Sequence, residues 1–162
     1  MQLNGFIYTL PKELKLLIAV FVIVLSIGFF SGLLFVGETS SVDPNGIEEQ
    51  YLGNEDDENA EVMKFKKSDK EMLSIVHSHI LSMSVIFFLL GILISITKLP
   101  RKLKLFLMTE PLLSVLLTFG GLFMLWEGII WMKYIVMISG TLMTLSFTGS
   151  VFIILKQLLK KQ

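Results

Sequence analysis

The stretch LKLLIAVFVIVLSIGFFSGLLFV, residues 14–36, contains a single charged residue, Lys15, in 23 positions. A helix of about 20 apolar residues crosses the roughly 30 Å hydrocarbon layer of a bilayer. This stretch therefore predicts a transmembrane helix. A cleaved signal peptide is the alternative, but the apolar core is too long for one and no cleavage site of small residues follows it.

Three further apolar runs of similar length follow, at about residues 75–97, 105–126 and 134–155. None alternates apolar and polar residues as a membrane β-barrel requires. The chain is 53% hydrophobic and has a mean hydropathy of +0.73, whereas soluble domains are about 45–50% apolar. We therefore predict an all-α, polytopic membrane protein, in which one domain, residues 1–162, forms a four-helix transmembrane bundle in a lipid bilayer.

Charge is unevenly distributed along the chain although the formal net charge is zero. Eleven acidic residues and four lysines lie between Glu38 and Glu71, whereas the rest of the chain has ten basic and three acidic residues. Basic residues cluster before the first apolar run, between the second and third runs, and after the fourth. If the chain has four spans, all of these clusters lie on the same side of the membrane: Lys12, Lys15, Lys98, Arg101, Lys102, Lys104, Lys156, Lys160 and Lys161. By the positive-inside rule, we expect a bacterial inner-membrane protein with cytoplasmic termini and an outer acidic loop, residues 38–72.

The acidic loop is too short and too polar to bury a core of its own. Its DPNG motif, residues 43–46, predicts a turn, and Ser68 followed by Glu71 has the spacing of a helix capping box. The carboxylates of GNEDDENAE, residues 53–61, suit calcium, but they miss the ligand spacing of calcium-binding loops. A solvated acidic segment is the interpretation that we favour there.

Several function classes are excluded or disfavoured. The chain has no cysteine, which excludes disulfides, thiolate metal sites and cysteine nucleophiles. It contains no nucleotide-binding, serine-hydrolase or zinc-protease motif. The basic clusters are explained by membrane topology and are not accompanied by a nucleic-acid-binding motif. We therefore expect no nucleic acid partner and no independent catalytic activity.

The two histidines of the chain, His77 and His79, lie in SIVHSHILSMSVIFF, residues 74–88. Residues two apart on a helix point about 200° away from each other, so the pair cannot bind one metal ion together while this segment is helical. The helix face of His77 carries small residues that allow close helix packing, including Ser84 and Gly91. We therefore expect His77 to face the bundle interior and His79 to lie near lipid or another subunit.

Both histidines precede most of their apolar run, so we expect them at the outer interface, level with Trp126, Glu127 and Met137. Met83 or Met137 would supply a thioether as a second axial ligand to haem b, and Glu127 would orient an imidazole. Three interpretations stay open: hydrogen bonding to headgroups, ligation of haem b or a metal ion, and proton or quinone chemistry. Because the other runs contain no histidine, a bis-histidine haem would need a homodimer or a partner membrane subunit.

Glu110 lies inside the third apolar run, close to Lys104 and Arg101. A salt bridge to one of these basic residues near the inner interface is the interpretation that we favour. Intramembrane carboxylates are often functional, so a role in an ion pathway is the alternative.

The motifs PNGIEEQYLGNE, residues 44–55, and EMLSIVHSHILSMS, residues 71–84, resemble those of a group of small bacterial four-helix membrane proteins. That group has an outer G-x-x-E-x-Y-x-G loop and a helix that starts with H-x-H, and the resemblance covers about residues 44–91. It implies that the loop folds back over the histidines to form one site. The residues of this site would be Gly46, Glu49, Tyr51, Gly53, His77 and His79, with Glu49 and the histidines available to a metal ion.

These features predict a small haem b-binding or metal-binding subunit, or an accessory protein, of a membrane redox system, with the cofactor at the outer face. One alternative is a membrane assembly protein whose acidic loop docks a partner. Another is a small proton-coupled transporter that uses Glu110.

Overall fold

A computed structural model of the chain describes residues 6–39, 43–55 and 62–160. These residues form a short 3-10 helix and five α-helices, namely η1 (Ile7–Thr9), α1 (Lys12–Thr39), α2 (Pro44–Leu52), α3 (Asp69–Ser95), α4 (Arg101–Trp126) and α5 (Met132–Leu158). The helices α1, α3, α4 and α5 are each long and apolar enough to cross a membrane. The predicted all-α architecture with four membrane helices is confirmed.

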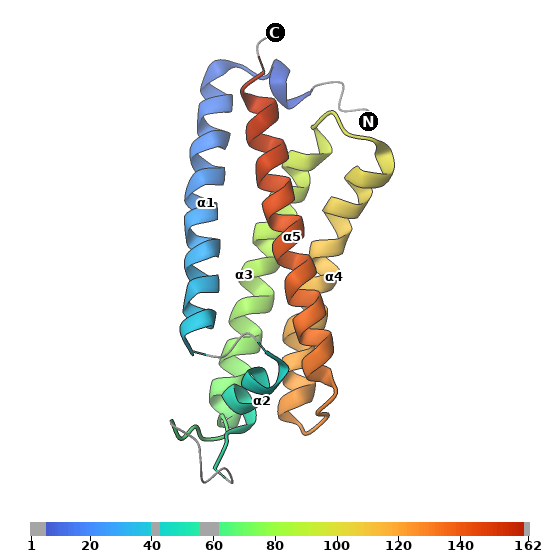
Figure 1. The fold of residues 1–162 in the computed structure, drawn as a ribbon. Coiled ribbons are helices and arrows are strands. Elements are labelled where there is room, and N and C mark those ends of the chain that lie inside the picture. The colour runs from blue at the N-terminus through green and yellow to red at the C-terminus, as the bar shows by residue number, and fades with distance from the viewer. Residues whose placement is uncertain (1–5, 40–42, 56–61, 161–162) are drawn as a thin grey trace.

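The four long helices run side by side, with both chain termini at one end of the bundle and α2 at the other (Figure 1). We call these the terminal end and the α2 end. The helix α4 packs along both α3 and α5, whereas α1 packs mainly against α5 and leaves most of its side chains exposed. Lipid chains can cover this surface, because its side chains are apolar and the helix satisfies its own backbone hydrogen bonds. The bundle is therefore a tightly packed α3–α4–α5 core with α1 at its side.

Large apolar side chains fill the interior of the bundle. Phe147 of α5 is completely buried and contacts Phe87 of α3 edge to face and Phe29 of α1 face to face. These three rings join helices that are distant in the sequence. They attach α1 to α3 and α5.

The terminal end is fastened by backbone and amide hydrogen bonds. The Ile7 amide donates to the Ile96 carbonyl oxygen at 2.8 Å, which holds η1 against the end of α3. The Lys98 amide donates to Oε1 of Gln157 at 2.7 Å, and Nε2 of Gln157 donates back to the Lys98 carbonyl at 3.3 Å. This two-way contact connects the α3–α4 turn to the end of α5.

The start of α3 follows the predicted capping box. Oγ of Ser68 accepts from the Glu71 amide at 3.4 Å, and Oε2 of Glu71 accepts from the Ser68 amide at 2.9 Å. The helix therefore begins at Asp69, six residues before the apolar run at Ile75. Fewer than two helical turns therefore precede the apolar run on α3.

The DPNG motif is a helix start, and the turn predicted from it is wrong. Asp43 is the N-cap of α2, and its Oδ1 accepts from the Gly46 amide at 2.7 Å. Pro44 occupies the first helical position, where its missing N–H costs nothing. The aspartate thus accepts from a free backbone N–H of the first turn, and the proline stands where no N–H is needed. Part of the acidic loop therefore folds into α2.

Candidate functional site

His79 is held in one orientation by two contacts. Its Nδ1 lies 2.8 Å from the carbonyl oxygen of Ile75, one turn earlier on α3. Its ring stacks on Phe119 of α4, with 4.8 Å between the ring centroids and 29° between the ring planes. A carbonyl oxygen only accepts hydrogen bonds, so Nδ1 carries the proton. In the neutral ring, Nε2 then keeps a free lone pair and is the atom that can bind a metal or accept a proton.

The depth of the histidines differs from the prediction. Phe119 precedes Trp126, the last residue of α4, by seven positions, which is about 10 Å along the helix. His79 stacks on Phe119, so it lies about that distance below the end of α4 and not level with Trp126 and Glu127. The turn between α3 and α4 sets this level, because His79 precedes the end of α3 at Ser95 by 16 residues and Phe119 follows the start of α4 at Arg101 by 18.

The expectation that His77 faces the bundle interior is also wrong. Both histidines are exposed, and His79 is the one whose ring contacts a neighbouring helix. The buried side of α3 carries mainly large apolar residues, namely Met72, Phe87, Leu90, Gly91 and Ile94. In this helix, the fit of bulky side chains against α4 decides the inward face, and Gly91 is the one small residue that approaches α4 closely, near Met108.

An exposed polar patch surrounds the histidines on α3. It consists of Ser74, His77, Ser78, His79 and Ser82, all of which are exposed. The hydroxyl groups of Ser78 and Ser82 donate to carbonyl oxygens four residues earlier, each at 2.7 Å, so the serines are satisfied within their own helix. The imidazoles are the groups in this patch with capacity to ligate a metal ion.

Of the other ligand candidates, Met83 lies near His79 on α3, whereas Met137 and Glu127 belong to other parts of the bundle. Met83 is one turn beyond His79 on α3 and packs partly buried against the apolar core. Met137 is partly buried near the start of α5, and Glu127 is exposed immediately after α4. Across residues 6–39, 43–55 and 62–160, no group of three or more histidine, aspartate or glutamate side chains is arranged to hold a metal ion. One chain thus presents one oriented imidazole, and ligation of haem b or a metal stays a prediction.

The α2 segment, which the resemblance places over the histidines, packs instead against α4 and α5. Nζ of Lys133, at the start of α5, lies 2.6 Å from Oε2 of Glu48 and 3.1 Å from Oδ1 of Asn45. Nε1 of Trp126 donates to the Lys67 carbonyl at 2.8 Å, and Lys66 lies over the Trp126 ring. These contacts fix α2 and residues 64–68 as a cap on the α2 end, which we call the α2 cap.

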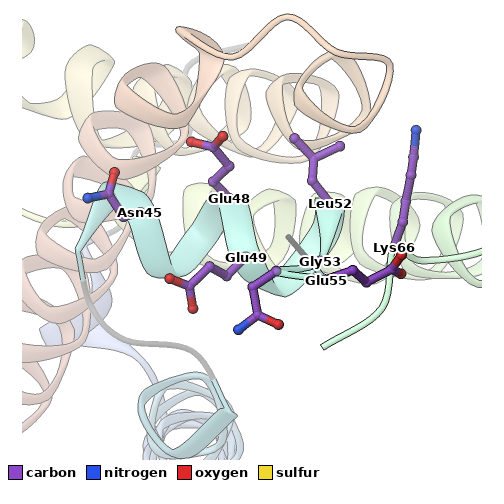
Figure 2. A pocket seen from close by; sticks show the side chains of 8 residues that line it. Asn45, Glu48, Glu49, Leu52, Gly53, Glu55 and Lys66 are labelled. Carbon is purple, nitrogen blue, oxygen red and sulfur yellow. The ribbon is translucent and has the colours of Figure 1, made fainter. Parts of the chain in front are cut away.

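Tyr51 and Glu49 belong to the α2 cap. Tyr51 packs against the apolar core, and this burial raises the pKa of its phenol above the ordinary value. Figure 2 shows Glu48 and Leu52 on one side of α2 and Glu49 on the other. The cap contains an open cavity of about 740 Å³, lined by Asn45, Glu48, Glu49, Leu52, Gly53, Asn54, Glu55 and Lys66. No histidine lines it, so Glu49 and the two histidines belong to separate surfaces.

The backbone at Gly53 closes the α2 cap. Gly53 has φ +85°, and a Cβ there would lie 2.8 Å from the Lys66 amide nitrogen and 2.9 Å from the Lys64 carbonyl oxygen. The residue also forms an isolated antiparallel bridge with Phe65. The glycine that the resemblance places in the site therefore has a structural role, because it lets two chain segments approach closely.

Glu110 does not form the predicted salt bridge. Its Oε1 accepts from Oγ of Ser114 at 2.5 Å, and its Oε2 accepts from Oγ of Ser146 on α5. Nζ of Lys104 instead donates to the Ser95 carbonyl at 2.8 Å. The preferred interpretation of Glu110 is wrong because the register of α4 against α5 places a serine hydroxyl at the carboxylate, which the sequence alone does not reveal.

A second polar contact between α4 and α5 lies closer to the α2 end and was missed by sequence reasoning. The hydroxyl groups of Thr118 and Ser139 lie 2.7 Å apart, and both residues are buried. The run of serines at positions 139, 146 and 150 on one face of α5 was the available signal. Polar contacts of this kind stabilise membrane helix pairs.

Comparison with known proteins identifies the membrane domain. A family described as a transmembrane helical domain, Aq_1264_TM, matches residues 41–162, which contain α2, α3, α4 and α5. No curated protein and no solved structure matched the chain. The family match covers well over half of the chain, and the four long apolar helices agree with its description. The chain is therefore an integral membrane protein that belongs to the Aq_1264_TM family of transmembrane helical domains.

Proposed function

We propose that the protein is a small subunit of a membrane redox system, in which His79 ligates haem b or a metal ion. The observation that carries this proposal is the hydrogen bond from Nδ1 of His79 to the Ile75 carbonyl at 2.8 Å. Ligating histidines commonly donate their second nitrogen to a carbonyl or carboxylate, which fixes the tautomer and the ring orientation. His79 already has this arrangement, with Nε2 as the ligating atom.

Phe119 supports the same role. Its ring stacks on His79 and limits rotation of the imidazole about its side-chain bonds. An imidazole with few accessible orientations loses less entropy when it binds a cofactor than a freely rotating one does. The aromatic contact and the Ile75 hydrogen bond together orient Nε2 before any ligand arrives.

The exposed patch on α3 favours a neighbouring subunit that completes the site. Ionisable groups inside membranes nearly always face a bundle interior, a partner or a water-filled cavity. Here His77 and His79 are exposed on the surface of a helix that has the length and composition of a membrane span. A second copy or a partner membrane subunit that covers this patch would shield the imidazoles and supply the remaining ligand.

The sidedness that we propose follows from the basic residues. Lys12, Arg101 and Lys156 all lie at the terminal end of the bundle, because α1, α4 and α5 begin or end there. The positive-inside rule assigns such an end to the cytoplasm of a bacterial inner membrane. The α2 cap and His79 are then on the outer side, where the cofactor would exchange electrons with a periplasmic or membrane partner.

Purified protein from cells supplied with haem and metals tests this proposal. We expect a Soret absorbance band or a stoichiometric metal ion in the wild-type protein and its loss in His79→Ala. His77→Ala is the matched control, because His77 is also exposed on the same helix but has no recorded ring contact with Phe119. Colourless, metal-free wild-type protein, or equal loss in both variants, would contradict the assignment to His79.

A further inference from the structure

Glu110 is located deep within the membrane span of α4. It follows Arg101, the first residue of α4, by nine positions, which is about 13 Å along the helix. Its partner Ser146 lies near the middle of α5, fourteen residues after Met132 and twelve before Leu158. Both helices are membrane spans by length and hydropathy, so the carboxyl group is several turns from either helix end.

The carboxyl group joins two helices through two hydroxyl groups. Ser114 donates to one carboxyl oxygen from one turn further along α4, and Ser146 donates to the other from α5. Both serine side chains are buried, with 3% and 5% of their surface exposed. The acceptor capacity of the carboxyl group is thus met by neutral donors and not by a cation.

The charged groups of the neighbouring elements lie elsewhere. On α4, Lys104 is engaged with the Ser95 carbonyl, and Arg101 and Lys102 are exposed at the helix start. On α5, Lys156 lies over Phe152 and Lys133 pairs with Glu48. The ionisable groups of α1 and α3 are Lys12, Glu13, Lys15, Glu38, Asp69, Lys70, Glu71, His77 and His79. Within the part of the chain that the structure describes, none of these cations forms an ion pair with Glu110.

Pro111 adds an acceptor next to this carboxyl group. Proline has no backbone N–H, so a proline inside a helix leaves the carbonyl oxygen four residues earlier without its usual donor. Pro111 is inside α4, and the carbonyl concerned is that of Leu107, which is buried. The helix hydrogen-bond ladder is thus interrupted within one turn of Glu110.

We propose that Glu110, Ser114 and Ser146 form an intramembrane site that binds an exchangeable proton. An ionised carboxylate without a paired cation is costly in a medium of low dielectric, and a bound proton removes that cost. When the proton is bound, the carboxyl group donates one hydrogen bond and still accepts from a serine. When the proton leaves, both oxygens accept, as the two serine contacts allow. The α4–α5 contact thus persists while its hydrogen-bond pattern changes.

A hydrophobic carbodiimide is the direct probe of such a site. The reagent reacts with a protonated carboxyl group, because the carboxyl proton moves to a carbodiimide nitrogen while the carboxyl oxygen bonds to the central carbon. Full-length protein in detergent or liposomes would be treated at a series of pH values, and the adduct would be located by peptide mass mapping. We expect labelling at Glu110 that decreases as the pH rises.

Variants define the contribution of each group. Glu110→Gln should lose the adduct, whereas Glu127→Gln, at the exposed end of α4, should keep it. Ser146→Ala should keep the adduct at Glu110, because the reagent bonds to the carboxyl group and not to the serine. Peptide mapping of the wild-type protein identifies the labelled residue without any variant, so the test does not depend on the folding of Glu110→Gln.

Three results would overturn the proposal. The first is the absence of an adduct at Glu110 at every pH in folded wild-type protein. The second is labelling that does not change with pH. The third is protection of Glu110 by sodium ions at constant pH, since competition would assign the site to a metal cation instead of a proton. Because the site is remote from His79, each outcome is independent of the proposed cofactor ligation.

Discussion

Phe29 of α1 lies face to face with Phe147 of α5, with ring centroids 3.8 Å apart and ring planes 8° from parallel. Phe29 is buried in a helix whose other large side chains are mostly exposed. In a lipid environment the hydrophobic effect does not drive helices together, so attachment depends on close packing and polar contacts. The aromatic stack is therefore one of the close contacts that position α1 against the α3–α4–α5 core, together with the buried Val22.

Replacement of Phe147 should loosen this attachment. Phe147→Ala removes the stack with Phe29 and the edge contact with Phe87. Buried Phe→Ala changes cost about 3–5 kcal/mol in soluble cores, and we expect about 1–3 kcal/mol here because detergent or lipid replaces part of the lost apolar contact. Phe152→Ala on the same helix, with 65% of its surface exposed, is the control. Thermal unfolding in detergent measures both, and equal effects would refute the role of the stack.

Alkaline pH should release the α2 cap through Tyr51. Burial raises the pKa of the Tyr51 phenol, so the undocked form loses its proton at lower pH than the docked form. The stabilisation is complete below the ordinary tyrosine pKa of about 10 and is lost as the pH rises toward the raised value. Trp126 fluorescence reports docking, because Trp126 contacts the cap. Tyr51→Phe should remove the Tyr51-dependent part of the transition, and an unchanged pH profile in this variant would contradict the prediction.

Gly53→Ala should disrupt the α2 cap more than Gly128→Ala disrupts its own turn. Both glycines have positive φ, at +85° and +102°, so both substitutions introduce backbone strain of about 1–2 kcal/mol. At Gly53 the new Cβ would also overlap backbone atoms of Lys64 and Lys66, whereas Gly128 has open space around it. Hydrogen exchange of the α2 amides should increase only in Gly53→Ala. Equal protection in the two variants would show that the close approach is unimportant.

The ion pair between Lys133 and Glu48 should contribute modestly and depend on salt. The side chains are 12% and 32% exposed, which places the pair between a surface and a buried salt bridge. Solvent and the entropy of two long side chains reduce what such a pair contributes, so we expect a small coupling energy. A double-mutant cycle with Lys133→Met and Glu48→Gln isolates the pair. The coupling energy should fall between about 0.05 M and 1 M salt, and a value that does not change would indicate that the pair is inaccessible to ions.

The four membrane spans could be predicted from the sequence, because the length of an apolar run can be compared directly with the thickness of the bilayer. The sequence was insufficient for the helix ends and for α2, since Asp43 and Pro44 fit both a turn and a helix N-terminus. The partner predicted for Glu110 was wrong, because Ser146 is 36 positions away and meets it only through the packing register. The inward face of α3 was predicted wrongly for a similar reason, because it depends on how the side chains of α3 pack against those of α4.

The family match begins at residue 41, after α1, and the matched region contains three of the four candidate spans. A region with three spans begins on one face of the membrane and ends on the other. With α1 there are four spans, so α1 begins on the face where α5 ends. Thr39, the last residue of α1, comes only four residues before Asp43, the N-cap of α2. The loosely packed helix therefore carries the chain to the end of the bundle at which the α2 cap folds.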